Sequence, residues 1–247
     1  MKNSPIEYVG ASPVRRKRNN PLGGWLLVIF ALGVSAIFLK PLLPFLQAQQ
    51  KLTSKSNLNE AIQMLESDGS FQDRLAASAL QRTLTPVTFD KSYYEIDFPN
   101  GDISNDRGNR ADVIVRAYRG VGVDLQEDVH NDMSSNFRRY PQIFNRKEAD
   151  SNIDHRLIQN LERFFARNGD SLPVTTEALD YSVGDIVIWR LIDGTPHSGI
   201  VVPGPGAKHS EKWIVHNMNS TPLWEDRLFD YKVIGHYRYS KLSQFSR

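Results

Sequence analysis

A long apolar run dominates the first part of the hydrophobic pattern along this chain. Residues 22–39 (LGGWLLVIFALGVSAIFL) contain no charged side chain, and four cations at residues 15–18 (RRKR) precede them. Eighteen apolar residues are close to the roughly 20 that cross a bilayer as a helix, and flanking positive charge stays on the cytoplasmic side. We therefore predict a disordered cytoplasmic tail over residues 1–20 and a transmembrane anchor over residues 21–46, with the remainder of the chain on the far side of the membrane.

A cleaved signal peptide is the alternative interpretation of the same run. Such a peptide has a shorter apolar core that ends at a cleavage site with small residues. The residues after the run offer only Gln47-Ala48-Gln49, which is a poor site. The pattern therefore favours an uncleaved anchor.

Helical periodicity follows this run, and strand periodicity ends the chain. Apolar residues recur at helical spacing from about residue 58 to the Asp68-Gly69 break, and then over residues 71–84, 111–118, 125–137 and 156–168. Segments rich in β-branched and aromatic residues, separated by turn residues, then occupy residues 185–191, 198–202, 212–217 and 233–239. Helices followed by an antiparallel sheet are the order of an α+β domain. We predict this domain over residues 71–247, behind a spacer and juxtamembrane helix at residues 47–70.

Charge and cysteine content restrict the chemistry. The first 40 residues contain six basic residues and one acidic residue, whereas the rest contains 24 basic and 27 acidic residues. The predicted domain is thus slightly acidic, which argues against a nucleic-acid partner. The chain has no cysteine, which excludes disulfides and thiol catalysis. His130 with Asp132, and Asp154 with His155, lack the spacing of known metal motifs. We expect neither a metal nor a cofactor.

One segment resembles an active-site loop. Residues 98–110 (FPNGDISNDRGNR) form a turn and an exposed loop that lead directly into the helix predicted from Ala111. With the blocks YSVGDIVIW, PHSGIVV and IVHN, this segment resembles a family of exported bacterial proteins of unknown function that look like NlpC-type, papain-like cysteine peptidases of cell-wall peptides. In that family the loop usually reads Asp-Arg-Gly-Val-Cys-Thr-Asp, and the cysteine is the presumed nucleophile. Here Arg110 occupies the cysteine position.

The resemblance also implies the partners of the missing nucleophile. His197, at the start of a predicted strand, corresponds to the base, because those peptidases carry it in a similar His-x-Gly-Ile context. The residue that orients the base comes from the next strand. Alternation along that strand places His216 and Asn217 on opposite faces, so His216, which the resemblance favours, and Asn217 both remain candidates.

Arg110 is the feature that redirects the interpretation from catalysis to binding. A guanidinium neither titrates near neutral pH nor acts as a nucleophile, and a cation in the first turn of a helix opposes the helix dipole. We predict that Arg110 grips an anion such as a stem-peptide carboxylate. The same predicted ligand-binding set contains Asp106 and Arg107 in the loop, Asp112 at the helix start and Tyr94 in the preceding extended segment. Asp112 is also expected to pair with an arginine, Arg107 or Arg110.

The prediction is therefore a single-pass protein of the bacterial inner membrane with a periplasmic NlpC-like domain. Its expected role is to bind a peptidoglycan peptide or an envelope protein without cutting it. One alternative is an active peptidoglycan amide hydrolase with a nucleophile other than cysteine. Ser104 and Ser198 are the nearby serines, and neither lies in a Gly-x-Ser-x-Gly elbow. The other alternative is a structural docking subunit of an envelope complex.

Overall fold

The computed structural model describes Gly10, Trp25, residues 28–30, Leu32, and residues 42–205, 211–218 and 220–241. The chain divides into two units, residues 1–52 and 53–247. Within the described residues, no helix combines the length and the apolar character needed to cross a membrane. Most of the predicted tail and anchor lies outside the described residues, so the anchor stays a prediction.

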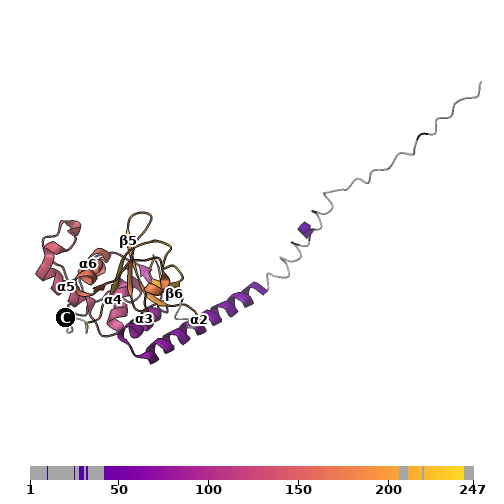
Figure 1. Cartoon of the computed structure of the whole chain (residues 1–247), viewed down its shortest axis with the longest axis horizontal. Helices are drawn as coiled ribbons and strands as arrows, with labels where there is room; N and C mark the ends of the chain where they lie inside the picture. The colour runs from indigo at the N-terminus through magenta and orange to yellow at the C-terminus, as the bar shows by residue number, and fades with distance from the viewer. Residues whose placement is uncertain are drawn as a thin grey trace, which may run out of the picture. The chain divides into compact units, whose positions relative to one another are not determined.

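Figure 1 labels the α-helices, and the bounds of α3 to α6 follow the predicted helical periodicity closely, whereas α2 begins well before the predicted residue 58. These are α2 (Leu42–Asp68), α3 (Phe71–Arg82), α4 (Asp112–Gly120), α5 (Leu125–Asn136) and α6 (Ile158–Asn168). Short 3-10 turns lie between and after them, at Phe137–Arg139, Ile143–Asn145, Asp154–Arg156 and Ala178–Asp180. Residues 47–57, predicted as a polar spacer, belong to α2.

In the described part of the chain, the strands form one antiparallel sheet of six and a small parallel pair. The large sheet has the order β3-β8-β4-β5-β6-β7, and β1 pairs with β2. The bounds are β1 (Thr88–Phe89), β2 (Arg107–Gly108), β3 (Asp170–Ser171), β4 (Ile186–Arg190), β5 (Pro196–Pro203), β6 (Lys212–His216), β7 (Leu223–Glu225) and β8 (Lys232–Arg238). The predicted α+β order, helices first and then an antiparallel sheet, is confirmed.

Each face of the large sheet has its own apolar cluster, because side chains alternate between faces along each strand. On one face, Ile188 and Ile200 join the core formed with α3, α4 and α6, which contact the sheet. On the other face, Val187, Trp189 and Ile214 pack in a smaller cluster. Strand β5 is buried almost from end to end, so whatever lies at its start is held by a rigid element.

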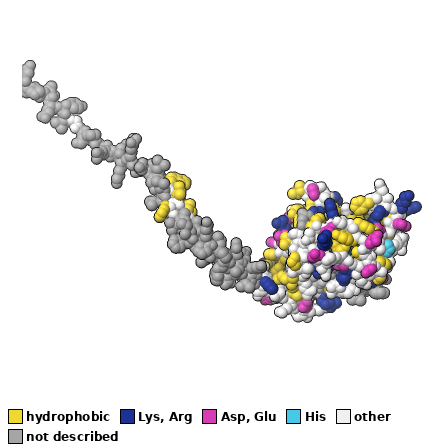
Figure 2. Space-filling view, turned by 180° about the vertical axis from the view of Figure 1, so that it is seen from behind, with side chains coloured by type: hydrophobic (Ala, Val, Ile, Leu, Met, Phe, Trp, Pro, Cys, Tyr) yellow, Lys and Arg dark blue, Asp and Glu magenta, His cyan; other side chains and the backbone are white. Residues whose placement is uncertain are grey.

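The surface of the globular part is mixed in charge. Figure 2 shows basic and acidic side chains interspersed over the visible face, with apolar side chains between them. This pattern agrees with the near balance of 30 basic and 28 acidic residues in the whole chain. The visible face therefore lacks the broad basic stripe that typically binds nucleic acid.

Candidate functional site

Side-chain hydrogen bonds fix the end of the loop that leads into α4. The Asn109 side chain accepts a hydrogen bond from the backbone N–H of Ala111 at 2.7 Å, and the Asp112 carboxylate accepts one from the backbone N–H of Asn109 at 2.7 Å. Helix α4 begins at Asp112, with Ala111 as the N-cap. Arg110 therefore lies one residue before the N-cap, and its predicted place in the first turn is wrong. Its charge opposes the helix dipole less there, because the effect falls off rapidly from the terminus.

The Arg110 side chain joins this loop to two turns of the sheet. Its Nε donates to the carbonyl oxygen of Met218 at 3.2 Å, and its Nη1 donates to Thr195 Oγ1 at 3.4 Å. The guanidinium also lies 5.9 Å from the centre of the Phe89 ring. The Ser198 hydroxyl donates to the Arg110 carbonyl at 3.4 Å. Both the backbone and the side chain of Arg110 are thus attached to the residues around the start of β5.

Three side chains on neighbouring strands form a hydrogen-bonded chain, which we call the histidine chain. His197 Nε2 lies 2.8 Å from His216 Nδ1, and His216 Nε2 lies 3.0 Å from Glu225 Oε2. The Glu225 carboxylate accepts, so His216 donates from Nε2 and accepts at Nδ1 from His197. This leaves a lone pair on Nδ1 of His197. Within the part of the chain that the structure describes, that nitrogen is buried without a hydrogen-bond partner.

Strand β4 covers the histidine chain with an aromatic ring. The Trp189 indole stacks on His197 with centroids 5.7 Å apart and an interplanar angle of 25°, and its N–H donates to the Leu228 carbonyl at 2.8 Å. Gly199 leaves room for this ring: a Cβ there would lie 2.8 Å from Trp189 and 2.5 Å from Ile214. The glycine of the His-x-Gly-Ile pattern is therefore required by packing.

The environment keeps both imidazoles neutral. Burial, the neighbouring His216 and the Arg110 cation lower the pKa of His197 to about 3. Burial also lowers the pKa of His216, although Glu225 acts in the opposite direction. A base with so low a pKa binds a proton poorly at neutral pH.

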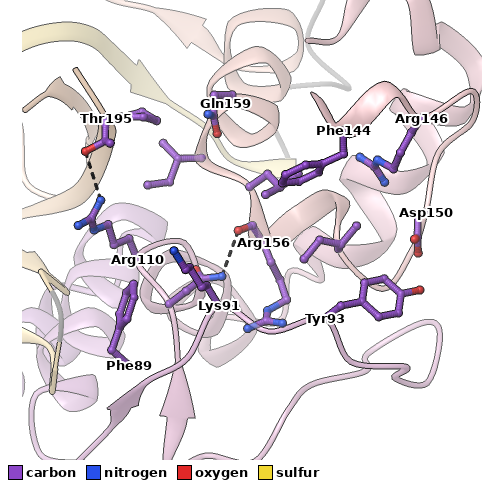
Figure 3. A pocket seen from close by; sticks show the side chains of 15 residues that line it. Phe89, Lys91, Tyr93, Arg110, Phe144, Arg146, Asp150, Arg156, Gln159 and Thr195 are labelled. Atoms are coloured by element: carbon purple, nitrogen blue, oxygen red, sulfur yellow. Dashed lines mark hydrogen bonds between the residues drawn. The ribbon is translucent and has the colours of Figure 1, made fainter. Parts of the chain in front are cut away.

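On its other side, Arg110 borders a cavity of about 530 Å³, which we call the Arg110 pocket. Figure 3 shows Arg110 and Phe89 on one side of it and Phe144 and Arg146 on the other. Its lining is predominantly apolar and carries four cations against one acidic side chain. The lining residues are Phe89, Lys91, Tyr93, Asn109, Arg110, Phe144, Arg146, Asp150, Ile153, Arg156, Leu157, Ile158, Gln159, Thr195 and Pro196. His197 and His216 are not among them.

A buried ion pair fixes Arg156, one of the residues that line the Arg110 pocket. The Asp112 carboxylate receives Arg156 Nε at 3.0 Å and Nη2 at 3.1 Å, and both side chains are almost completely buried. Arg156 also donates to the carbonyls of Asp90 and Ser92, and its guanidinium lies over the Tyr94 ring. The expected pairing of Asp112 with Arg107 or Arg110 is thus replaced by Arg156. A residue 44 positions away had no local pattern that linked it to Asp112.

The remaining predicted ligand-binding residues lie outside the pocket lining. Arg107 pairs with Asp90 at 3.0 Å, and the Tyr94 hydroxyl donates to the same carboxylate at 2.6 Å. Asp106 is exposed and accepts from Ser104. The structure joins His197 to His216 and bonds the Arg110 carbonyl to Ser198, the neighbour of His197 along β5. It also groups Arg107 and Tyr94 around Asp90.

The strand after β5 contributes its histidine to the site. The Asn217 side chain accepts from the backbone N–H of Ser220 at 3.0 Å and stabilises the following turn. His216 is the residue that bonds to His197. Sequence reasoning missed Glu225, because β7 has only three residues and no clear alternation. It also missed Phe144 and Arg146, because they belong to a loop without periodicity.

No metal-binding group emerges from the described ranges: no three histidine or carboxylate side chains there lie close enough together to hold an ion. The site therefore has two parts. One is the neutral, enclosed histidine chain, and the other is the open Arg110 pocket, whose lining combines apolar side chains with cations.

Comparisons with known proteins give a family without an assigned activity. The domain of unknown function DUF1287 matches residues 76–239. The uncharacterized protein YijF of Escherichia coli strain K12 is 41% identical over 165 residues, which cover 67% of this chain and 80% of YijF. No solved structure matches the chain. From the extent of both matches, the chain belongs to the family of domain DUF1287.

Proposed function

We propose that this protein is an NlpC-like domain of the bacterial envelope that binds the carboxylate of a peptidoglycan peptide, or of an envelope protein, without hydrolysing it. The observation that carries the proposal is that Arg110 borders a 530 Å³ pocket of apolar and cationic character. In the resemblance to NlpC-type peptidases, Arg110 takes the position of the nucleophile cysteine. The predicted anchor at residues 21–46 would attach the domain to the inner membrane, with the domain in the periplasm.

The order and geometry of the elements support the relation to papain-like peptidases. In those enzymes a nucleophile at a helix start faces a histidine on a strand, and a third group on the next strand orients that histidine. Here the start of α4, His197 on β5 and His216 on β6 occur in the same order. His197 bonds to His216, and Ser198, the next residue along β5, donates to the Arg110 carbonyl. Glu225 continues the chain from β7.

Arg110 opposes hydrolysis in two ways. It supplies no nucleophilic atom, because a guanidinium stays protonated. Together with burial and the neighbouring His216, it also disfavours the imidazolium that a general base must become when it accepts a proton, and the pKa of His197 is lowered accordingly. The proposal of an active hydrolase therefore lacks both the nucleophile and a competent base.

Arg110 and its surroundings suit an anion that carries apolar groups. A guanidinium forms paired, charge-assisted hydrogen bonds with carboxylates. Apolar walls, which include Phe89, Leu157 and Ile158, remove water and so strengthen such bonds. Peptides with a free carboxylate and short aliphatic side chains match both properties.

Binding to cell-wall sacculi tests the proposal. The full chain, solubilised in mild detergent, is expected to co-sediment with purified sacculi, and Arg110→Ala is expected to abolish this. Arg138→Ala is the matched control, because Arg138 is exposed and does not belong to the pocket lining.

Each alternative has its own signature in the same experiment. New muropeptides released by the wild-type chain, and not by His197→Ala, would overturn the noncatalytic role. Neither binding nor cleavage would leave the docking role and would reject peptide binding.

A further inference from the structure

The segment opposite Arg110 has an unusual backbone. Phe144 and Asn145 are consecutive non-glycine residues with positive φ, 61° and 51°. Such conformations are uncommon outside glycine and concentrate where surrounding structure or function requires them. Phe144 is 74% exposed, although it lines the pocket. The conformation therefore holds a large apolar side chain at the pocket wall instead of burying it.

The next residue leaves buried donors unused. Arg146 Nη2 lies 2.7 Å from Asp154 Oδ1, and the Arg146 side chain is only 18% exposed. Among the described residues, its Nε and Nη1 find no hydrogen-bond partner and are shielded from solvent. Buried guanidinium donors without an acceptor are costly and call for an explanation. An acceptor that arrives with a ligand provides one.

The position of Arg146 connects these donors with the pocket. Arg146 lines the Arg110 pocket and also a neighbouring cavity of about 440 Å³. In Figure 3 its guanidinium lies beside the Phe144 ring, across the pocket from Arg110. A small shift of residues 143–146 would therefore expose the unused donors to a ligand in the pocket.

The surrounding charges define the acceptor. Asp154 already balances the charge of Arg146, and Asp150 lies in the same wall, with its backbone N–H donating to Asp154 at 2.6 Å. A second carboxylate would face both acids. A neutral oxygen, such as an amide carbonyl, meets the donors without this repulsion.

We propose that Arg146 is a second ligand contact, which the segment of residues 143–146 uncovers when a peptide enters, and that its Nε and Nη1 donate to a main-chain carbonyl of that peptide. The peptide's terminal carboxylate then lies at Arg110, and its aliphatic part lies between the two arginines. This inference rests on the proposed function, and it narrows the ligand class to an extended peptide with a free carboxylate at one end and an amide carbonyl further along.

Titration with a stem tetrapeptide that ends in D-alanine tests this assignment on the full chain. Arg146→Lys keeps a positive charge for Asp154 but lacks Nε and Nη1. It is expected to weaken binding about tenfold or more, the order expected for hydrogen bonds to a charged group. Arg138→Lys, at an exposed arginine, is expected to bind as the wild type does. Equal melting temperatures for the two variants would show that the loss is not caused by unfolding.

A chemical change in the peptide tests the carbonyl. A thioamide sulfur accepts hydrogen bonds more weakly than an amide oxygen. A thioamide at the contacted position is expected to weaken binding to the wild type, with no further loss in Arg146→Lys. Independent losses at every position would overturn the assignment, because non-additivity marks a direct pair.

Nitrogen-15 spectra of the arginine side chains provide a readout that needs no variant to fold. The Nε–H signal of Arg146 is expected to shift when the tetrapeptide binds. Binding that depends on Arg110 but leaves this signal and the Arg146→Lys affinity unchanged would overturn the Arg146 contact and leave the proposed function standing. Absence of tetrapeptide binding to the wild type would overturn both.

Discussion

The histidine chain and the Arg110 pocket lie on either side of one arginine, yet they are built in different ways. The histidine chain comes from three neighbouring strands, β5, β6 and β7, and His197 and His216 are almost fully enclosed. The pocket is lined mainly by loops and short turns and is open. Loops tolerate change and carry function, whereas strands fix geometry. Under the proposed function, the strands therefore preserve the arrangement of a peptidase-like site, while the adaptable loops offer a cationic cavity.

The largest expected effect is the loss of unfolding free energy when the ion pair between Asp112 and Arg156 is removed. Asp112→Asn leaves the Arg156 guanidinium buried without its carboxylate. Removal of one partner of a buried pair costs about 3–5 kcal/mol of unfolding free energy. Urea denaturation of the full chain measures this.

An exposed pair provides the matched control for that change. Asp230→Asn disrupts the contact with Arg227, in which both side chains are about half exposed, and such pairs contribute about 0–1 kcal/mol. Equal losses in the two variants would contradict a supporting role for the Asp112–Arg156 pair.

The next largest effect is the pH dependence of stability, which tests whether the histidine chain is buried. Burial lowers the pKa of His197 to about 3 and of His155 to about 4, and it also lowers that of His216. The unfolded chain, with histidine pKa values of about 6.5, binds more protons in this range. Stability is therefore full above pH 6.5 and falls as the pH decreases toward 4, by about 1 kcal/mol per pH unit for His197 and for His155, and His216 acts in the same direction.

Removal of one histidine sharpens this test. His197→Phe is expected to reduce the slope of unfolding free energy against pH between 6 and 4.5 by about one proton. A slope equal to that of the wild type would mean that His197 is already accessible to protons in the folded state.

A smaller effect asks whether the histidine chain still faces position 110. In Arg110→Cys, a thiol would stand at the residue whose carbonyl bonds to Ser198, next to His197, and the cation that contributes to the lowered pKa of His197 would be gone. We expect iodoacetamide to react about tenfold faster at pH 7 than with an ordinary thiol, whose pKa is about 8.5.

Two further variants complete that comparison. Ser135→Cys places an exposed thiol on α5 as the ordinary reference. Adding His197→Ala to Arg110→Cys is expected to return the rate to this reference. Equal rates for all three thiols would indicate that His197 does not activate a thiol at position 110.

The smallest effect concerns the pocket wall. Phe144→Gly removes an exposed side chain from a backbone with φ of 61°, a conformation that glycine adopts freely. We expect a gain in unfolding free energy of up to about 1 kcal/mol. Leu179→Gly, at an exposed side chain with ordinary φ, is expected to lose about 0.5–1 kcal/mol. A loss at Phe144 as large as that at Leu179 would show that the wall is unstrained.

The periodic parts of the molecule were predictable from sequence. The helices and strands followed 3.6- and 2-residue spacing, so α4, α5, α6 and the four long strands were found within a few residues. His216 and Asn217 were both candidates for the partner of His197, and the resemblance favoured His216. Periodicity could not choose between them, because the choice depends on which face of β6 lies on the same side of the sheet as His197. Periodicity gives the alternation but not the facing partner.

The pocket depends on long-range pairing and was not predictable in the same way. Arg156 reaches Asp112 and the carbonyls of Asp90 and Ser92 only in the folded chain. Phe144 and Arg146 lie in a turn whose backbone departs from every regular pattern. Irregular segments carry no period, so their side chains can be assigned only when the surrounding elements are in place.

Because Trp189 stacks on His197, this tryptophan can serve as an intrinsic fluorescence probe of the histidine chain. The chain has four tryptophans, and Trp189 is the one held flat against the histidine chain, with its N–H fixed to the Leu228 carbonyl. Its emission therefore reports on the imidazole next to it without any added label. A chain that retains Trp189 and loses the other three tryptophans would allow the events around Arg110 to be followed by light alone.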